Sequence, residues 1–280
     1  MSQNTLGDFL KPEGFERPER SALLREATVF QEIGRYARGT LAEATRRRAT
    51  AYTSRAPQRH SDPVLLVPAF LAPEATLSLL TRSLRGAGFR TYSSRLRVNV
   101  GCTMGAAEQV ERRLEQVSEQ RGAKVRLVGH SLGGMIARGV AARRPDLVSG
   151  IVTLGSPMLA PGAHHGSLSR GVEVLTKLSR FGVPGLMAED CVAGDCARES
   201  FTSARTPLAD HVDFTALYSR RDGFVDWRAC MDPEAVSHEV SASHVGMVFD
   251  PEAIALVIDA LRNPVRGAVS AVEIDRGEIA

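Results

Sequence analysis

The amino-acid sequence predicts an α/β protein built on a mostly parallel sheet of about six strands, with helices on both faces. Short apolar segments alternate with helical ones from Pro63 onward. The first of them, residues 64–67, is continuously apolar, which is typical of a strand buried on both faces. The chain of 280 residues is 43% hydrophobic, enough for one sizeable core. We expect that core to span residues 63–263.

An N-terminal helical arm and linker, residues 1–62, precede the core. Residues 1–20 are polar and expected to be irregular. Residues 21–48 place apolar residues on one helical face: Leu23, Ala27, Phe30, Ala37 and Leu41. Residues 53–63 form a linker rich in Ser, Pro and Arg. Residues 1–60 hold eleven Lys and Arg against seven Asp and Glu, whereas the whole chain has a net charge of only +3. This basic excess indicates a solvated helical face, or contact with an anionic membrane surface or an acidic partner.

Within the core, the alternation predicts each element in chain order. Strands are expected over residues 64–67, 89–93, 124–129, 150–155, 214–218 and 236–241, and helices over residues 75–86, 105–120, 133–144 and 251–262. A cap or lid insertion is expected at about residues 158–212, between two core strands. Residues 264–280 form a C-terminal tail without a clear pattern.

A Gly-x-Ser-x-Gly motif follows the third predicted strand, with Ser131 at its centre. A strand before the motif and a helix after it are the context in which it forms a nucleophile elbow. Gly129 and Gly133 flank the turn because a Cβ there would collide with neighbouring backbone. A serine hydroxyl needs a base to become nucleophilic. Ser131 is therefore the candidate nucleophile, and the alternative is a plain strand-to-helix turn.

His244 is the candidate general base. Of the seven histidines, it alone lies after the last predicted strand and before the last helix. That loop belongs to the sheet edge where Ser131 is expected. His60 precedes the core, and His130 is expected to point away from the nucleophile. The others lie in the insertion, before a strand or within one: His164, His165, His211 and His238. The alternative for His244 is a capping or surface histidine.

Asp222 is the candidate carboxylate that orients His244. It directly follows the predicted strand 214–218 and therefore reaches the same sheet edge. The order Ser, Asp, His along the chain is the one that this kind of elbow uses. Asp226 is the competing carboxylate. Asp222 and Gly223 could also form a plain turn.

Two backbone N–H groups are expected to stabilise the negative charge of a tetrahedral intermediate. Leu132, the residue after the nucleophile, is the first candidate donor. The second should come from the loop after the first core strand, and we assign it to Phe70.

With these motifs the chain resembles the α/β-hydrolase superfamily, and most of all its bacterial lipase and esterase branch of triacylglycerol-lipase-like proteins. The resemblance covers roughly residues 63–263 and rests on residues 63–71, 128–134, 152–157, 218–223 and 243–246. It implies the α/β-hydrolase fold and no organic cofactor. The chain departs from the family pattern at Pro68-Ala69, where His-Gly or Pro-Gly is usual. An alanine disfavours a positive φ in that loop.

The resemblance implies a serine hydrolase that cleaves carboxylic esters with a hydrophobic acyl group, through an acyl-enzyme on Ser131. A thioesterase or an acyltransferase would use the same triad, and a non-catalytic lipid-binding protein could keep the same fold. The apolar residues of the insertion either line an acyl pocket or form ordinary core contacts: Leu168, Val172, Leu175, Leu178, Phe181, Leu186 and Met187.

The four cysteines, Cys102, Cys191, Cys196 and Cys230, match no common zinc spacing, and we predict no metal ligands. Cys191 and Cys196 could close a small disulfide loop, but reduced thiols are expected in the cytoplasm. A cytoplasmic location is expected because the sequence shows neither a signal pattern nor an apolar run long enough to cross a membrane. No nucleic-acid-binding motif accompanies the basic charge. The sequence leaves the oligomeric state open.

Overall fold

The computed structural model describes residues 6–38 and 62–264 of the chain. Within them, parallel strands form one six-stranded sheet in the order β2-β1-β3-β4-β5-β6. The strands are β1 (Pro63–Val67), β2 (Arg90–Ser93), β3 (Val125–His130), β4 (Val148–Leu154), β5 (Asp213–Tyr218) and β6 (Val236–Glu239). β1 and β3 are buried at every position. Burial on both faces explains the continuous apolar sequence of β1, whereas β3 also buries Arg126, which lies close to Asp62 and Asp213. The predicted α/β architecture is confirmed.

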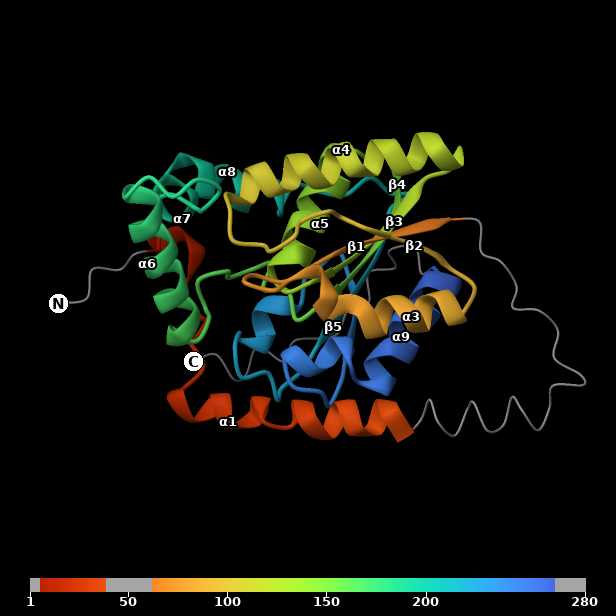
Figure 1. Cartoon of the computed structure of the whole chain (residues 1–280), viewed down its shortest axis with the longest axis horizontal. Helices are drawn as coiled ribbons and strands as arrows, with labels where there is room; N and C mark the ends of the chain where they lie inside the picture. Colours follow the sequence, from red (N-terminus) through yellow and green to blue (C-terminus); the bar gives the residue numbers. More distant parts are fainter. Residues whose placement is uncertain (1–5, 39–61, 265–280) are drawn as a thin grey trace, which may run out of the picture.

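Helices cover both faces of the sheet (Figure 1). α4 (Thr103–Arg121) and α5 (Leu132–Arg143) lie on one face, and α3 (Ser78–Gly86) and α9 (Pro251–Arg262) lie on the other. The short 3-10 helix η3 (Glu74–Leu77) leads into α3, so the predicted helix at 75–86 is split in two. Each face has its own apolar core, with Val110 and Ile136 in one and Leu80 and Val257 in the other.

The N-terminal arm packs beside α9 (Figure 1). It contains η1 (Asp8–Leu10), η2 (Arg20–Ala22), α1 (Leu23–Glu26) and a second helical segment over residues 29–38. The predicted helix at 21–48 is thus interrupted by a turn, and its part beyond residue 38 lies outside the described residues, as do His60 and most of the linker. Arg35 Nη2 lies 2.8 Å from Asp250 Oδ2, at the N-terminus of α9.

The insertion between β4 and β5 lies at one end of the sheet (Figure 1). It contains α6 (Gly166–Arg180), α7 (Asp190–Ala193) and α8 (Asp195–Ser203). Leu6 and Leu10 of the arm share an apolar cluster with Val172, Leu175 and Met187 of the insertion, so the two outer segments pack against each other. Among the described helices, none is both long and apolar enough to cross a membrane.

Candidate active site

Ser131 stands on a sharp turn between β3 and α5. Its φ is +53° and its ψ is −123°, a backbone conformation that residues other than glycine rarely adopt. A Cβ on Gly129 would lie 2.4 Å from the Cα atom of Gly134, and a Cβ on Gly133 would lie 2.3 Å from the Val67 carbonyl oxygen. The predicted close approach of backbone at both glycines is confirmed. The turn holds Ser131 at the carboxyl edge of the sheet.

Asp222 and His244 meet at the same edge. Asp222 Oδ2 accepts a hydrogen bond from His244 Nδ1 at 2.6 Å. The other carboxylate oxygen, Oδ1, accepts the main-chain N–H groups of Phe224 and Val225, each at 2.8 Å. Both members of the pair are buried. The carboxylate is therefore held by its own loop while it orients the imidazole.

The competing carboxylate, Asp226, has a different set of partners. Its Oδ1 accepts the main-chain N–H of Arg228 and so caps the 3-10 helix η4 (Trp227–Cys230). Its Oδ2 accepts the main-chain N–H of Glu16, from the N-terminal arm, at 3.0 Å. Asp226 thus ties the arm to the core, and Asp222 is the carboxylate that contacts the histidine.

The His244 ring lies against the residues that neighbour Ser131. The main-chain N–H of Ser131 donates to the Leu154 carbonyl oxygen at 2.8 Å, at the end of β4. Gly155, the next residue, has a φ of +55°, and a Cβ there would lie 3.0 Å from His244 Nδ1. A side chain at this position would displace the imidazole. The loops after β3, β5 and β6 therefore bring Ser131, Asp222 and His244 to one edge of the sheet.

The charges around His244 favour its protonated form. Burial acts to lower the pKa of His244, but the negative charge of Asp222, its hydrogen bond and the charge of Glu26 outweigh burial and raise the pKa above its ordinary value of 6.5. A raised pKa means that the protonated ring, the imidazolium, is stabilised by its surroundings. The neutral imidazole is therefore a better proton acceptor.

His130 contacts the loop that carries His244. The sequence predicts only that His130 points away from the nucleophile, and it does not predict this contact. Its Nε2 lies 3.0 Å from the His244 carbonyl oxygen, and the two rings are 5.0 Å apart. Burial and the charge of His244 lower the pKa of His130 to about 3. His130 therefore stays neutral and donates a hydrogen bond that supports the backbone of His244.

Glu26 of the arm joins the two loops that carry Asp222 and His244. Its Oε1 accepts the main-chain N–H of Gly223 at 2.8 Å and that of His244 at 3.0 Å. Its Oε2 accepts the main-chain N–H of Val245 at 3.0 Å. Since these donors flank Asp222 and include His244 itself, one carboxylate fixes the distance between both loops.

Glu32 holds the loop from the other side and is only 1% exposed. Its Oε1 accepts the main-chain N–H of Ser243, and its Oε2 accepts the Ser243 hydroxyl, both at 2.8 Å. A Cβ on Gly246 would lie 1.6 Å from Glu32 Oε2, so this carboxylate fits only over glycine. Neither glutamate is predicted from the sequence, because both belong to an arm whose charged residues indicated a solvated face.

The loop proposed to supply the second oxyanion donor runs beside Ser131. Phe70 forms a β-bridge with Asn99, and Asn99 Nδ2 donates to the Pro68 carbonyl oxygen at 3.0 Å. The positive φ in this loop falls at Leu71, with a value of +60°, rather than at Ala69. Leu132 is the first residue of α5, so its N–H has no acceptor within the helix.

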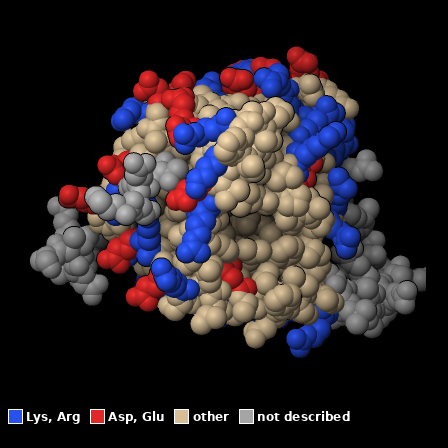
Figure 2. All heavy atoms as spheres, turned by 60° about the vertical axis from the view of Figure 1, so that its left-hand side comes forward, with Lys and Arg blue, Asp and Glu red and all other residues tan. Residues whose placement is uncertain are grey.

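A cavity of about 130 Å³ contains Ser131 in its wall. Phe70 and Leu132 line it, together with Leu168, Val172 and Met187 of the insertion. The apolar residues of the insertion therefore differ in their surroundings. Leu168, Val172 and Met187 line the cavity, whereas Phe181 is 86% exposed. Leu6 and Leu10, from the segment expected to be irregular, also line the cavity. The face that carries the insertion is hollowed between uncharged residues, with Lys and Arg at its margins (Figure 2).

The two histidines of the insertion have local partners. His164 Nδ1 lies 2.7 Å from the Pro161 carbonyl oxygen, and its Nε2 lies 3.2 Å from Ser169 Oγ. His165 Nδ1 accepts the main-chain N–H of Ser167 and caps α6. His164 also lines the cavity.

Comparison with known proteins places the site in context. A family model described as the alpha/beta hydrolase fold matches residues 62–173. Triacylglycerol lipases from Pseudarthrobacter phenanthrenivorans and Burkholderia plantarii are each 46% identical to the chain over 54 residues. These matches cover 19% of this chain but only 17% and 15% of the two lipases. The chain therefore aligns with less than a fifth of the length of these relatives.

Solved structures match over a larger part of the chain. The mature form of a Bacillus licheniformis lipase superimposes with a TM-score of 0.58 at 13% identity, over 75% of this chain and 95% of that one. A monoacylglycerol lipase from Paleococcus ferrophilus gives a TM-score of 0.50 at 18% identity, over 71% and 95% of the two chains. At these identities the likeness shows a shared fold.

Proposed function

We propose that this chain is a serine hydrolase that cleaves carboxylic esters, in keeping with its α/β-hydrolase fold and with the family model that matches residues 62–173. One observation carries the proposal: the buried 2.6 Å hydrogen bond between Asp222 and His244, next to the strained elbow of Ser131. A strained backbone at Ser131 persists only where the surrounding structure enforces it, and such strain clusters at active sites. The partial match to triacylglycerol lipases supports the same chemistry.

In the proposed mechanism, Ser131 Oγ attacks the ester carbonyl while His244 Nε2 takes its proton. Asp222 keeps the other ring nitrogen, Nδ1, protonated and stabilises the imidazolium. The main-chain N–H groups of Leu132 and Phe70 donate hydrogen bonds to the negatively charged oxygen of the tetrahedral intermediate. His244 then protonates the leaving alcohol, an acyl-enzyme forms on Ser131, and water activated by His244 releases the acid.

The cavity supports an ester with a hydrophobic acyl group. Apolar side chains from three parts of the chain line the cavity. They include Leu10 of the arm, Met135 of α5 and Val172 of α6. An alkyl chain placed there leaves water and gains about 0.8 kcal/mol per buried methylene group. Phe70 and Leu132 also face this space, so the acyl carbonyl would sit between the apolar wall and the two proposed donors.

Hydrolysis of a series of p-nitrophenyl esters of increasing acyl length tests the proposal. The expected result is turnover that increases with chain length and is lost in Ser131→Ala. Ser156→Ala is the matched control, because Ser156 is another buried serine close to the elbow and its hydroxyl donates to the Leu154 carbonyl oxygen. No turnover of any ester by folded protein would contradict the proposal. Transfer of the acyl group to an added alcohol or thiol in preference to water would identify an acyltransferase instead.

A further inference from the structure

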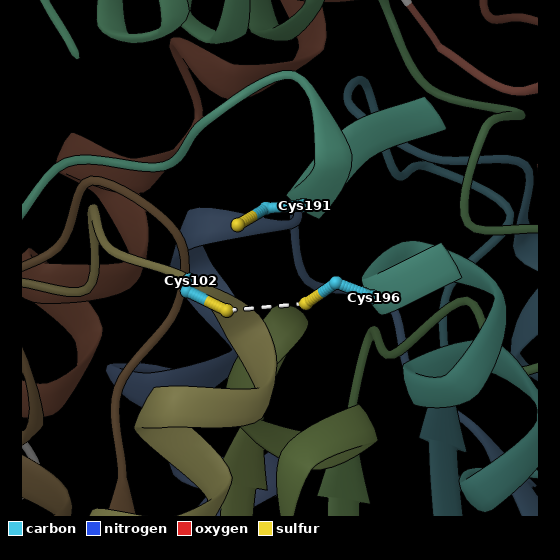
Figure 3. Close-up of side chains that lie close together, drawn as sticks. All are labelled: Cys102, Cys191 and Cys196. Atoms are coloured by element: carbon cyan, nitrogen blue, oxygen red, sulfur yellow. Dashed lines mark hydrogen bonds between the residues drawn. The ribbon is translucent and has the colours of Figure 1, made fainter. Parts of the chain in front are cut away.

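Three cysteine thiols converge at the junction between the core and the insertion (Figure 3). Cys102 stands at the N-terminus of α4, Cys191 belongs to α7, and Cys196 belongs to α8. Their sulfur atoms all lie within 4.8 Å of one another, and the sulfurs of Cys102 and Cys196 are 3.2 Å apart. Figure 3 shows the three side chains pointing toward a common space.

The cluster is not explained by a disulfide. All four cysteines of the chain carry free thiols, including the Cys191 and Cys196 pair that the sequence allowed to form a small loop. A disulfide would use two of the three converging thiols and leave the third beside it. The 3.2 Å contact joins Cys102 to Cys196, which are 94 residues apart in the chain. The spacing along the sequence therefore could not indicate the cluster.

The arrangement suits a soft metal ion. Zinc–sulfur bonds of about 2.3 Å place the sulfurs of a tetrahedral site about 3.8 Å apart, a separation that small side-chain rotations would reach from the present positions. Thiolate sulfur is the ligand that Zn²⁺ and Cu⁺ prefer. Cys102 is the N-cap residue of α4, where the helix dipole favours a negative charge on the sulfur.

We propose that Cys102, Cys191 and Cys196 form a binding site for one thiophilic cation, Zn²⁺ or Cu⁺. Each thiol that binds the ion releases its proton to solvent, and no electron transfer takes place. Three sulfurs complete the trigonal coordination that suits Cu⁺, whereas Zn²⁺ would take a water molecule as its fourth ligand.

The bound ion would attach the insertion to the core. Cys102 belongs to the core, and the other two ligands belong to the short helices of the insertion. Cys191 also lines the cavity that contains Ser131, so the ion would fix one wall of that cavity. The site does not depend on ester hydrolysis and can exist whether or not the chain is a hydrolase.

Metal titration of the full-length protein, reduced and kept free of oxygen, tests the proposal. Co²⁺ serves as a spectroscopic probe for Zn²⁺, because thiolate coordination gives intense near-ultraviolet charge-transfer absorption. Cu⁺ is titrated separately against a competing chelator. We expect one ion per chain, loss of three titratable thiols on binding, and a higher Tm for the loaded protein, since an ion that binds only the folded state stabilises it.

Cys102→Ser is the most informative variant, because serine keeps a good N-cap at α4 but removes a soft ligand. We expect it, and Cys196→Ala, to weaken binding by more than about 100-fold, since even groups that only support metal ligands are worth 10–100-fold. Cys230→Ala is the control, because Cys230 is buried elsewhere and should leave binding unchanged. Unchanged affinity in Cys102→Ser would overturn the proposal. So would reduced, folded protein that takes up neither ion, or a Cys102–Cys196 disulfide in a protein that binds no metal after reduction.

Discussion

The carboxylate of Glu32 accepts both the main-chain N–H and the hydroxyl of Ser243, each at 2.8 Å. Ser243 immediately precedes His244, and another glutamate of the arm, Glu26, accepts the N–H of His244 itself. The N-terminal arm and the loop of the proposed base thus form one hydrogen-bonded unit. Substitutions in this unit should affect both the stability of the protein and its catalytic activity, because the unit positions His244.

Glu32→Ala should destabilise the protein and reduce its activity. The variant leaves two buried donors of Ser243 without acceptors, at a cost of about 1–3 kcal/mol for each. The loop of His244 loses its support, so kcat should fall as well. Urea denaturation and ester hydrolysis measure the two effects. Glu13→Ala, an exposed glutamate on the same arm, should change neither. Wild-type stability in Glu32→Ala would show that the arm does not hold this loop.

Gly246→Ala should destabilise the protein through Glu32. The new methyl group would stand 1.6 Å from Glu32 Oε2, so the carboxylate must leave its position. In a Glu32→Ala background the same substitution should cost less, and the two variants should show a coupling energy of about 0.5–3 kcal/mol in a double-mutant cycle. Gly86→Ala is the control, because a Cβ there would have nothing within 4 Å and the φ of Gly86 is not positive. Strictly additive costs for the pair would argue against the contact.

The pH profile of kcat/KM should have its acidic limb above pH 6.5. His244 acts as a base only when neutral, and Asp222 and Glu26 raise its pKa above the ordinary value of 6.5 despite burial. Glu26→Gln should therefore move the limb to lower pH, as a pH-stat assay would measure. Stability depends on pH in the opposite direction to activity. The stability that His244 contributes is fully present below the pKa of His244 in the unfolded chain and is lost as pH rises through its pKa in the folded protein. An acidic limb that stays at the same pH in Glu26→Gln would show that the charge of Glu26 does not raise the pKa of His244.

Asp222→Asn should reduce kcat by about 10⁴-fold with little loss of stability, because an amide cannot hold the required tautomer of the histidine. Asp226→Asn should have the reverse pattern. It weakens the cap of η4 and the hydrogen bond to Glu16, so Tm should fall while kcat stays within about tenfold of wild type. Comparing kcat and Tm for the two variants decides between the carboxylates. Equal losses of kcat would undo the assignment of Asp222.

Much of the core could be predicted from the sequence because its signals are local. Buried parallel strands such as residues 64–67 are continuous apolar runs, and the elbow at Ser131 has a glycine on each side for steric reasons. The contact between Asp222 and His244 could be predicted because a parallel sheet gathers the loops after its strands at one edge.

The remaining features depend on contacts between distant parts of the chain. Glu32 and Ser243 are 211 residues apart, and no local pattern separates a buried glutamate on the arm from a solvated one. Leu6 and Leu10 belong to a stretch whose polarity predicted irregular chain, yet they line the cavity together with the insertion. The same holds for Cys102, whose two neighbouring thiols come from helices of the insertion.

Covalent labelling by a fluorophosphonate tests the assignment of Ser131 as the nucleophile most directly. Intact-mass and peptide mass spectrometry of the labelled chain report both the stoichiometry and the modified residue. We expect one adduct per chain on Ser131, no adduct in Ser131→Ala, and a full adduct in Ser156→Ala. Folded wild-type protein that stays unlabelled, or that carries its adduct on another serine, would contradict the proposed mechanism.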